Sequence, residues 1–90
     1  MSEIRRYIKF YGRVQGVGFR YRAYYAARNF DVKGWVRNCC DGSVEMEVQS
    51  LEENIDKMIM TIEKGTFVMI ENMECKSLPL KDEQSFIIKD

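Results

Sequence analysis

The residues that could do chemistry gather where a glycine-rich segment leads directly into a predicted helix. Residues 12–18 contain three glycines, and Phe19 and Arg20 follow at once. A helix start has unpaired N–H groups and a partial positive charge, so a nearby cation is unfavourable and an anion is favourable. Arg20 breaks this rule unless an anion lies between it and the loop amides, which predicts a phosphate-binding site. The alternative is an ordinary tight turn followed by a solvated Arg20.

Asn38 is the second candidate, because it ends a predicted strand over residues 32–38, just before a turn signal at Asp41-Gly42. If this strand runs parallel to the one that precedes residues 12–18, its end lies at the same edge of the sheet as that loop. An amide there can donate to and accept from a water molecule beside a bound phosphate. Asparagine is also a common turn residue, which is the structural alternative.

Other phosphate and nucleic-acid motifs do not fit this segment. It lacks the lysine and hydroxyl of G-x-x-x-x-G-K-[ST] and the final glycine of G-x-G-x-x-G. Residues 15–21 loosely resemble the octamer of RNA-recognition motifs, but that octamer lies on a central strand with its aromatic residues on the open sheet face. Here the run opens a helix, and the strand predicted over 43–49 has no aromatic residue. We therefore expect no nucleic-acid binding.

Seven elements must position these residues. Alternation of apolar and polar residues indicates strands, and apolar residues at helical spacing indicate helices. The predicted strands cover residues 3–11, 32–38, 43–49, 68–76 and 85–89, and the predicted helices cover residues 19–30 and 50–65. Ser50-Leu51-Glu52-Glu53 fits a capping box at the start of the second helix. Met73 and Cys75 are expected to point inward, with Cys75 in the core.

The order β-α-β-β-α-β, with a short additional strand at the end, predicts an α+β protein. Its expected architecture is the ferredoxin-like split-βαβ sandwich, an antiparallel sheet with two helices on one face. With 90 residues and no visible linker, residues 1–90 are expected to form one domain. Because this fold serves many functions, the function must be argued from the site.

Charge is distributed unevenly along the chain. The 14 basic and 14 acidic residues give a formal net charge of zero, yet residues 1–38 carry +7, including every arginine, and residues 39–90 carry −7. Arginine suits the geometry of phosphate oxygens, so part of the positive charge is expected to steer small anions to the site. The alternative is two differently charged faces that keep the protein in solution.

The remaining composition excludes several classes of protein. The absence of histidine excludes Ser-His and Cys-His nucleophile pairs and the usual zinc sites, so no metal or cofactor is expected. No apolar run approaches the length of a membrane span, and the first residues do not resemble a signal peptide. We expect a cytoplasmic protein that does not bind membranes. The odd cysteine count excludes a complete disulfide framework, and Cys39 and Cys40 are expected to be reduced thiols.

Two segments carry a resemblance to a known family. Residues 12–20, Gly-Arg-Val-Gln-Gly-Val-Gly-Phe-Arg, resemble the first signature of the acylphosphatase family. Residues 34–38, Gly-Trp-Val-Arg-Asn, with Gly42 and Val44, resemble the second. One departure is Ser50, where the second signature usually ends in glycine. Length and element order extend the resemblance over all 90 residues.

The resemblance implies a metal-independent monomeric hydrolase of small acyl phosphates that uses no cofactor. Arg20 and the backbone amides of the loop would hold the phosphoryl group, and Asn38 would orient the attacking water. The substrate-binding loop residues implied are Gln15, Gly16, Val17, Gly18 and Phe19. The leaving carboxylate has a pKa of about 4, so it needs no general acid. This agrees with the absence of histidine.

A different class of function stays open at this point. The same fold and loop could form a non-catalytic module that binds phosphate or another anion. Asn38 favours the enzyme, because binding alone does not require an amide that orients water. Nothing in the sequence defines a pocket for the acyl part of a substrate.

Overall fold

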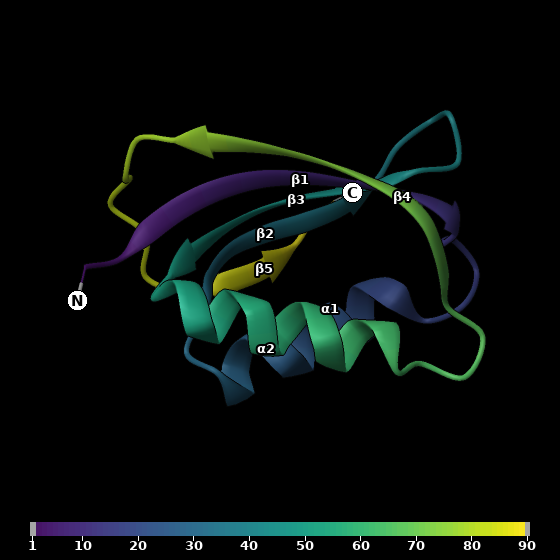
Figure 1. The fold of residues 1–90 in the computed structure, drawn as a ribbon, viewed down its shortest axis with the longest axis horizontal. Helices are drawn as coiled ribbons and strands as arrows, with labels where there is room; N and C mark the ends of the chain where they lie inside the picture. The colour runs from purple at the N-terminus through teal and green to yellow at the C-terminus, as the bar shows by residue number, and fades with distance from the viewer. Residues whose placement is uncertain (1, 90) are drawn as a thin grey trace.

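A computed structural model of the protein describes residues 2–89. The elements, in chain order, are β1 (Ile4–Arg13), α1 (Phe19–Asn29), β2 (Lys33–Asn38), β3 (Val44–Ser50), α2 (Glu52–Glu63), β4 (Met69–Leu78) and β5 (Phe86–Ile88). Both helices lie on one face of the sheet, and we call the other face, which carries no helix among residues 2–89, the open face (Figure 1). The predicted ferredoxin-like α+β architecture is confirmed. Within residues 2–89, no helix is long and apolar enough to cross a membrane.

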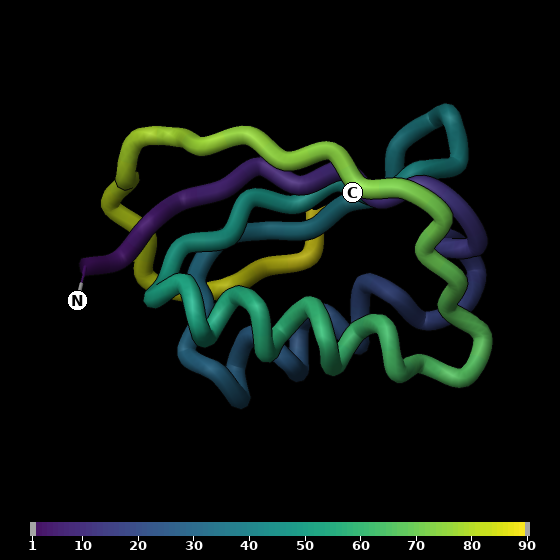
Figure 2. The backbone as a smooth tube through the Cα atoms, in the orientation of Figure 1, coloured from purple at the N-terminus to yellow at the C-terminus, as the bar shows by residue number. Residues whose placement is uncertain are grey.

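The sheet has five strands in the order β4-β1-β3-β2-β5, and it is mixed. β1 and β2 both pair antiparallel with β3, so they are parallel to each other, as predicted. The expectation of a wholly antiparallel sheet is wrong at one edge, where β5 pairs parallel with β2. After β4, the chain crosses to the opposite edge of the sheet at the end where β2 begins, so β5 must run in the direction of β2 (Figure 2).

The core lies between the sheet and the two helices. Alternate residues of β1, β2 and β3 face the helices, and each helix buries the face that its apolar spacing predicts. The buried residues that build this core include Ile8, Phe10, Val36, Val44, Met46 and Val48 from the sheet and Phe19, Ala23, Ala26, Ala27, Ile55, Met58 and Ile62 from the helices. Phe19 connects the site to this core, because its ring lies 5.0 Å from that of Phe10.

The predicted capping box is wrong. Ser50 is the last residue of β3 and is buried, and Leu51 precedes α2 without any capping bond from its side chain. The Ser50 hydroxyl donates instead to the backbone oxygen of Asp31, at 3.1 Å. Glu52 and Glu53 supply the negative charge that favours the first turn of α2. A serine two residues before a helix can therefore serve a tertiary contact rather than the helix.

The prediction for Cys75 is also wrong in part. Cys75 is exposed, although it pairs with buried Ile8 and therefore shares the face of the sheet that the helices cover. The helices pack over β2, β3 and β5, whereas β4 is the outermost strand beyond β1. Met73, next along this face, is half-buried against the core as predicted. The alternation of β4 indicated the correct face but not whether a helix covers it.

Candidate active site

The loop between β1 and α1 leaves a helix start without a side-chain cap. Gly16 and Gly18 have φ of +73° and +79°, a left-handed backbone that strains any residue with a Cβ. Gly18 occupies the N-cap position, no side chain caps the helix, and the first turn has no acidic residue. The first N–H groups of α1 are therefore available to an anion. The buried side chain of Val14 anchors the loop.

Arg20 is the second residue of α1 and is half-buried. Among residues 2–89, no carboxylate lies within ion-pair distance of its guanidinium. Arg5, Arg6 and Arg37, by contrast, all pair with glutamates. The combination of an uncapped helix start and an arginine without a carboxylate partner forms a positive site at this end of α1.

Asn38 reaches the same end of the molecule from the sheet. It is the last residue of β2 and lies two residues after Val36, so its side chain is on the face that the helices cover. Asn38 pairs with Val44, and Val44 pairs with Phe10 on β1. Because the ring of Phe10 contacts that of Phe19, this row of residues crosses the sheet beneath the start of α1. Arg20 and Asn38 thus come from different elements to one edge of the fold.

The side chain of Gln15 makes hydrogen bonds to the β2–β3 turn that the sequence did not predict. Its amide nitrogen donates to the backbone oxygens of Cys39 and Ser43, at 2.7 and 2.8 Å. These bonds connect the glycine-rich loop to the β2–β3 turn, directly after Asn38. The Gln15 side chain is thus a positioning group, because its amide nitrogen donates to two backbone oxygens within the protein. Its two acceptors lie 24 and 28 residues away, so no local pattern marks them.

Asp41 stabilises the β2–β3 turn from within. Hydrogen bonds from the hydroxyl and the backbone N–H of Ser43, with a further contribution from Lys9, lower the pKa of Asp41 to about 2. The Lys9 ammonium lies 3.3 Å from its carboxylate. Asp41 is therefore ionised and paired at neutral pH, and it adds no free negative charge beside the candidate phosphate site.

Other side chains with shifted pKa values lie on the open face of the sheet. Burial and a hydrogen bond donated to Glu45 raise the pKa of Tyr7 to about 12. Burial disfavours the charged form of Glu45, but hydrogen bonds from Tyr7 and Arg37 outweigh it and lower its pKa. These residues alternate with the core residues of β1, β2 and β3, so they face away from Asn38. They stabilise strand pairing rather than the site.

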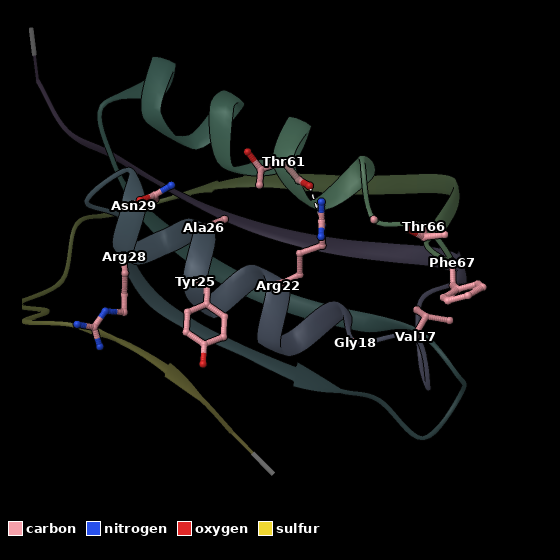
Figure 3. A pocket seen from close by; sticks show the side chains of 11 residues that line it. Val17, Gly18, Arg22, Tyr25, Ala26, Arg28, Asn29, Thr61, Thr66 and Phe67 are labelled. Atoms are coloured by element: carbon pink, nitrogen blue, oxygen red, sulfur yellow. Dashed lines mark hydrogen bonds between the residues drawn. The ribbon is translucent and has the colours of Figure 1, made fainter.

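Residues 2–89 contain no cluster of three or more metal-ligating side chains. They do form a groove of about 860 Å³ between α1 and α2, which begins at Val17 and Gly18 (Figure 3). The groove adjoins the loop but includes neither Arg20 nor Asn38. The sequence predicted no such pocket, because its walls come from two helices and from the turn at residues 65–67.

Comparisons with known proteins show which family model, which relatives and which solved structures resemble this chain. A family model described as acylphosphatase matches residues 6–88. An acylphosphatase of Clostridium acetobutylicum is 45% identical over 86 residues, which cover 93% of this chain and 94% of that protein. One of Oceanobacillus iheyensis is 46% identical over 69 residues, covering 74% and 76%. The crystal structure of an acylphosphatase from Bacillus subtilis superposes with a TM-score of 0.89 at 29% identity, covering 97% and 99% of the two chains.

Proposed function

The chain belongs to the acylphosphatase family of hydrolases, and from this premise we propose that its glycine-rich loop, Arg20 and Asn38 hydrolyse the carboxyl–phosphate bond of an acyl phosphate. The observation that carries the proposal is Arg20, a cation without a carboxylate partner among residues 2–89, at a helix start that no side chain caps. The products are a carboxylate and inorganic phosphate.

The phosphoryl group is held by backbone amides and one guanidinium. The N–H groups from Gly16 to Arg20 surround its oxygens, and the partial positive charge of the helix start adds to the attraction. The planar guanidinium of Arg20 donates to two phosphoryl oxygens at once. Val17, Gly18 and Phe19 take part through their backbones. The left-handed conformations of Gly16 and Gly18 support this arrangement, because they allow successive amides to face one ligand.

Asn38 orients the attacking water. Its side-chain oxygen accepts a hydrogen bond from the water and its nitrogen donates to a phosphoryl oxygen, which places the water in line with the bond that breaks. A phosphoryl group in transfer develops little new covalent character, so catalysis consists mostly of positioning and charge stabilisation. Water attacks phosphorus directly, and the carboxylate leaves without protonation because it is a weak base.

The test is the release of phosphate from acetyl phosphate in the presence of excess EDTA. Arg20→Ala and Asn38→Ala should each lower kcat about 10²- to 10³-fold, because each removes a group that acts mainly in the transition state. Lys57→Ala and Asn72→Ala are matched controls, because both residues are exposed and lie outside the site. Both control variants should keep the rate of the unchanged protein.

Two results would contradict the proposal. If Arg20→Ala and Asn38→Ala retain full activity, the active site lies elsewhere. If the unchanged protein binds inorganic phosphate at the loop, as seen by NMR, but leaves acetyl phosphate intact, the chain is a non-catalytic anion-binding module on the same fold.

A further inference from the structure

We propose that the groove between α1 and α2 is the subsite for the acyl group, and that it favours an aromatic acyl group through Phe67. This inference rests on the proposed function, since it concerns the part of the substrate that the phosphate loop does not hold. Val17 and Gly18 belong to both the loop and the groove. The phosphate loop and the groove are therefore contiguous.

The mouth of the groove presents unpartnered apolar surface. The side chains of Val17 and Phe67 both line this part of the groove, one from the loop and the other from the turn after α2 (Figure 3). The Phe67 side chain is 67% exposed, as is that of Tyr25 farther along the wall. An aromatic ring between Val17 and Phe67 would cover this surface and stack against or contact the edge of the Phe67 ring. The volume of the groove is within the usual range for small-molecule sites.

The walls of the groove are held in place by contacts between the two helices. The Nε of Arg22 donates to the backbone oxygen of Thr61 on α2, at 2.9 Å. A Cβ at Gly65 would lie only 3.1 Å from the Cδ of Arg22 and 2.9 Å from the Cγ2 of Val68, so the turn packs directly against this arginine. The groove is thus preformed, and binding does not have to order it.

The geometry of in-line attack favours the Phe67 side of the phosphate loop as the place for the acyl group. The attacking water and the leaving oxygen must lie on opposite sides of phosphorus. Asn38 ends β2, toward the edge of the sheet that α1 covers, whereas Phe67 precedes β4 at the opposite edge. With water on the Asn38 side, the leaving carboxylate and its acyl group point toward Phe67.

The far end of the groove is out of reach of a small acyl group. Arg28 lies ten residues beyond Gly18 in sequence, about 15 Å along the axis of α1 at the usual helical rise. A single aromatic ring next to the phosphate therefore contacts Val17 and Phe67 and not Arg28. Among the described residues that line the groove none is acidic, so nothing there repels a phosphorylated substrate.

The experiment compares benzoyl phosphate with acetyl phosphate. Phe67→Ala should lower kcat/KM for benzoyl phosphate about three- to tenfold, the range for loss of one aromatic contact, and should leave kcat/KM for acetyl phosphate unchanged. Met60→Ala is the matched control, because Met60 is 56% exposed on α2 and lies outside the groove. It should change neither value. Both substitutions affect exposed side chains, so folding should be preserved.

Binding without turnover provides a second measurement. Benzylphosphonate should bind Phe67→Ala about three- to tenfold more weakly than it binds the unchanged protein, whereas methylphosphonate should bind both equally. Equal effects of Phe67→Ala on the aromatic and the methyl ligand, or no effect on either, would overturn the subsite while leaving the proposed function intact. If no acyl phosphate is hydrolysed, the proposed function fails, and the phosphonate comparison still decides whether the groove binds an aromatic group.

Discussion

Arg20 and Arg22 stand two residues apart on the same helix, yet they have different partners. The Arg22 side chain donates to the backbone of α2, and within residues 2–89 no carboxylate pairs with Arg20. The same distinction separates Gln15 from Asn38. The amide of Gln15 is occupied by two backbone acceptors, whereas that of Asn38 has no hydrogen-bond partner in the described part of the chain. At the scale of the residue, a candidate role depends on which polar atoms remain unpaired.

Gln15→Ala tests this distinction. The loss of two partly buried hydrogen bonds should lower the free energy of unfolding by about 1–3 kcal/mol and loosen the turn that follows Asn38. We therefore expect a lower kcat for acetyl phosphate together with a lower urea midpoint. A kinetic defect with unchanged stability would instead indicate that the Gln15 side chain contacts the substrate. Gln84→Ala, at an exposed amide far along the chain, serves as the control.

Tyr7 and Glu45 provide a pH-dependent test on the open face of the sheet. The pKa of Tyr7 is raised from 10.0 to about 12, so the stabilisation it contributes is complete below pH 10 and is lost as the pH rises through about 12. In Tyr7→Phe, the free energy of unfolding should fall less between pH 10 and about 12 than it does in the unchanged protein. Urea unfolding at several pH values in this range would measure the difference. Glu45→Gln should bring the pKa of Tyr7, followed by NMR of its ring, closer to 10. Tyr21→Phe, at an exposed tyrosine, should leave the alkaline profile unchanged.

At the scale of the element, the site depends on the correct pairing of β2 with β3, because this pairing places Asn38. Gly34 allows the two strands to approach. Its φ is +136°, and a Cβ at this position would lie 1.9 Å from the backbone oxygen of Glu47. Gly42, in the turn at the other end of the hairpin, also has a positive φ, of +90°, but has open space around it. A side chain at Gly34 would therefore meet both backbone strain and a steric clash, whereas one at Gly42 would meet backbone strain alone.

Gly34→Ala should destabilise the protein far more than Gly42→Ala. The clash with β3 should lower the free energy of unfolding by about 4 kcal/mol or more, which is within the range of severe single substitutions. Gly42→Ala should lose about 1–3 kcal/mol, from backbone strain alone. Thermal unfolding followed by circular dichroism would compare them. Equal losses would show that the close approach at Gly34 relaxes easily.

At the scale of the whole molecule, the opposite charges of the two parts of the chain neutralise each other. Cations on β1 and β2 meet anions on β3, on α2, in the β2–β3 turn and in the segment before β5. These pairs are Arg5 with Glu47 and Glu83, Arg6 with Glu52 and Asp56, Lys9 with Asp41, and Arg37 with Glu45. Much of the +7 of the first part is thereby paired, and the charge left to attract anions is concentrated in fewer side chains, Arg20 among them.

Arg5 connects the C-terminal segment to the sheet. Its side chain is fully buried and donates to Glu47, Gln49 and Glu83, at 2.9, 3.1 and 2.9 Å. Arg5→Met should lower the free energy of unfolding by about 2–4 kcal/mol, because it leaves two carboxylates without their buried partner. Hydrogen exchange should increase in β5, which begins three residues after Glu83.

Arg6→Met is the matched control for Arg5→Met. Arg6 is the next residue along β1, but its partner Glu52 is 64% exposed, so its loss should lower the free energy of unfolding by less than about 1 kcal/mol. Similar effects of the two substitutions in urea unfolding would contradict the role assigned to Arg5.

The sequence was sufficient wherever a feature depends on neighbouring residues. Hydrophobic period and turn residues predicted both helices, all strands and the uncapped helix start at Arg20, because side-chain spacing and backbone strain act within a few residues. Strand parity also placed Met73 on the correct face. The capping box at Ser50 failed because a tertiary acceptor, the backbone of Asp31, took the hydroxyl.

Only the tertiary structure decided features that depend on distant segments meeting. Gln15 bonds to acceptors 24 and 28 residues away, Cys75 is exposed because the helices pack mainly over β2, β3 and β5, and β5 is parallel because the chain crosses the sheet first. The groove beside the loop lies between two helices, which a hydrogen bond from Arg22 to Thr61 joins across 39 residues of sequence. Local patterns determine what each segment can form. Packing across the whole fold decides which side chains are covered, paired or left free. The local spacing of residues does not predict this packing.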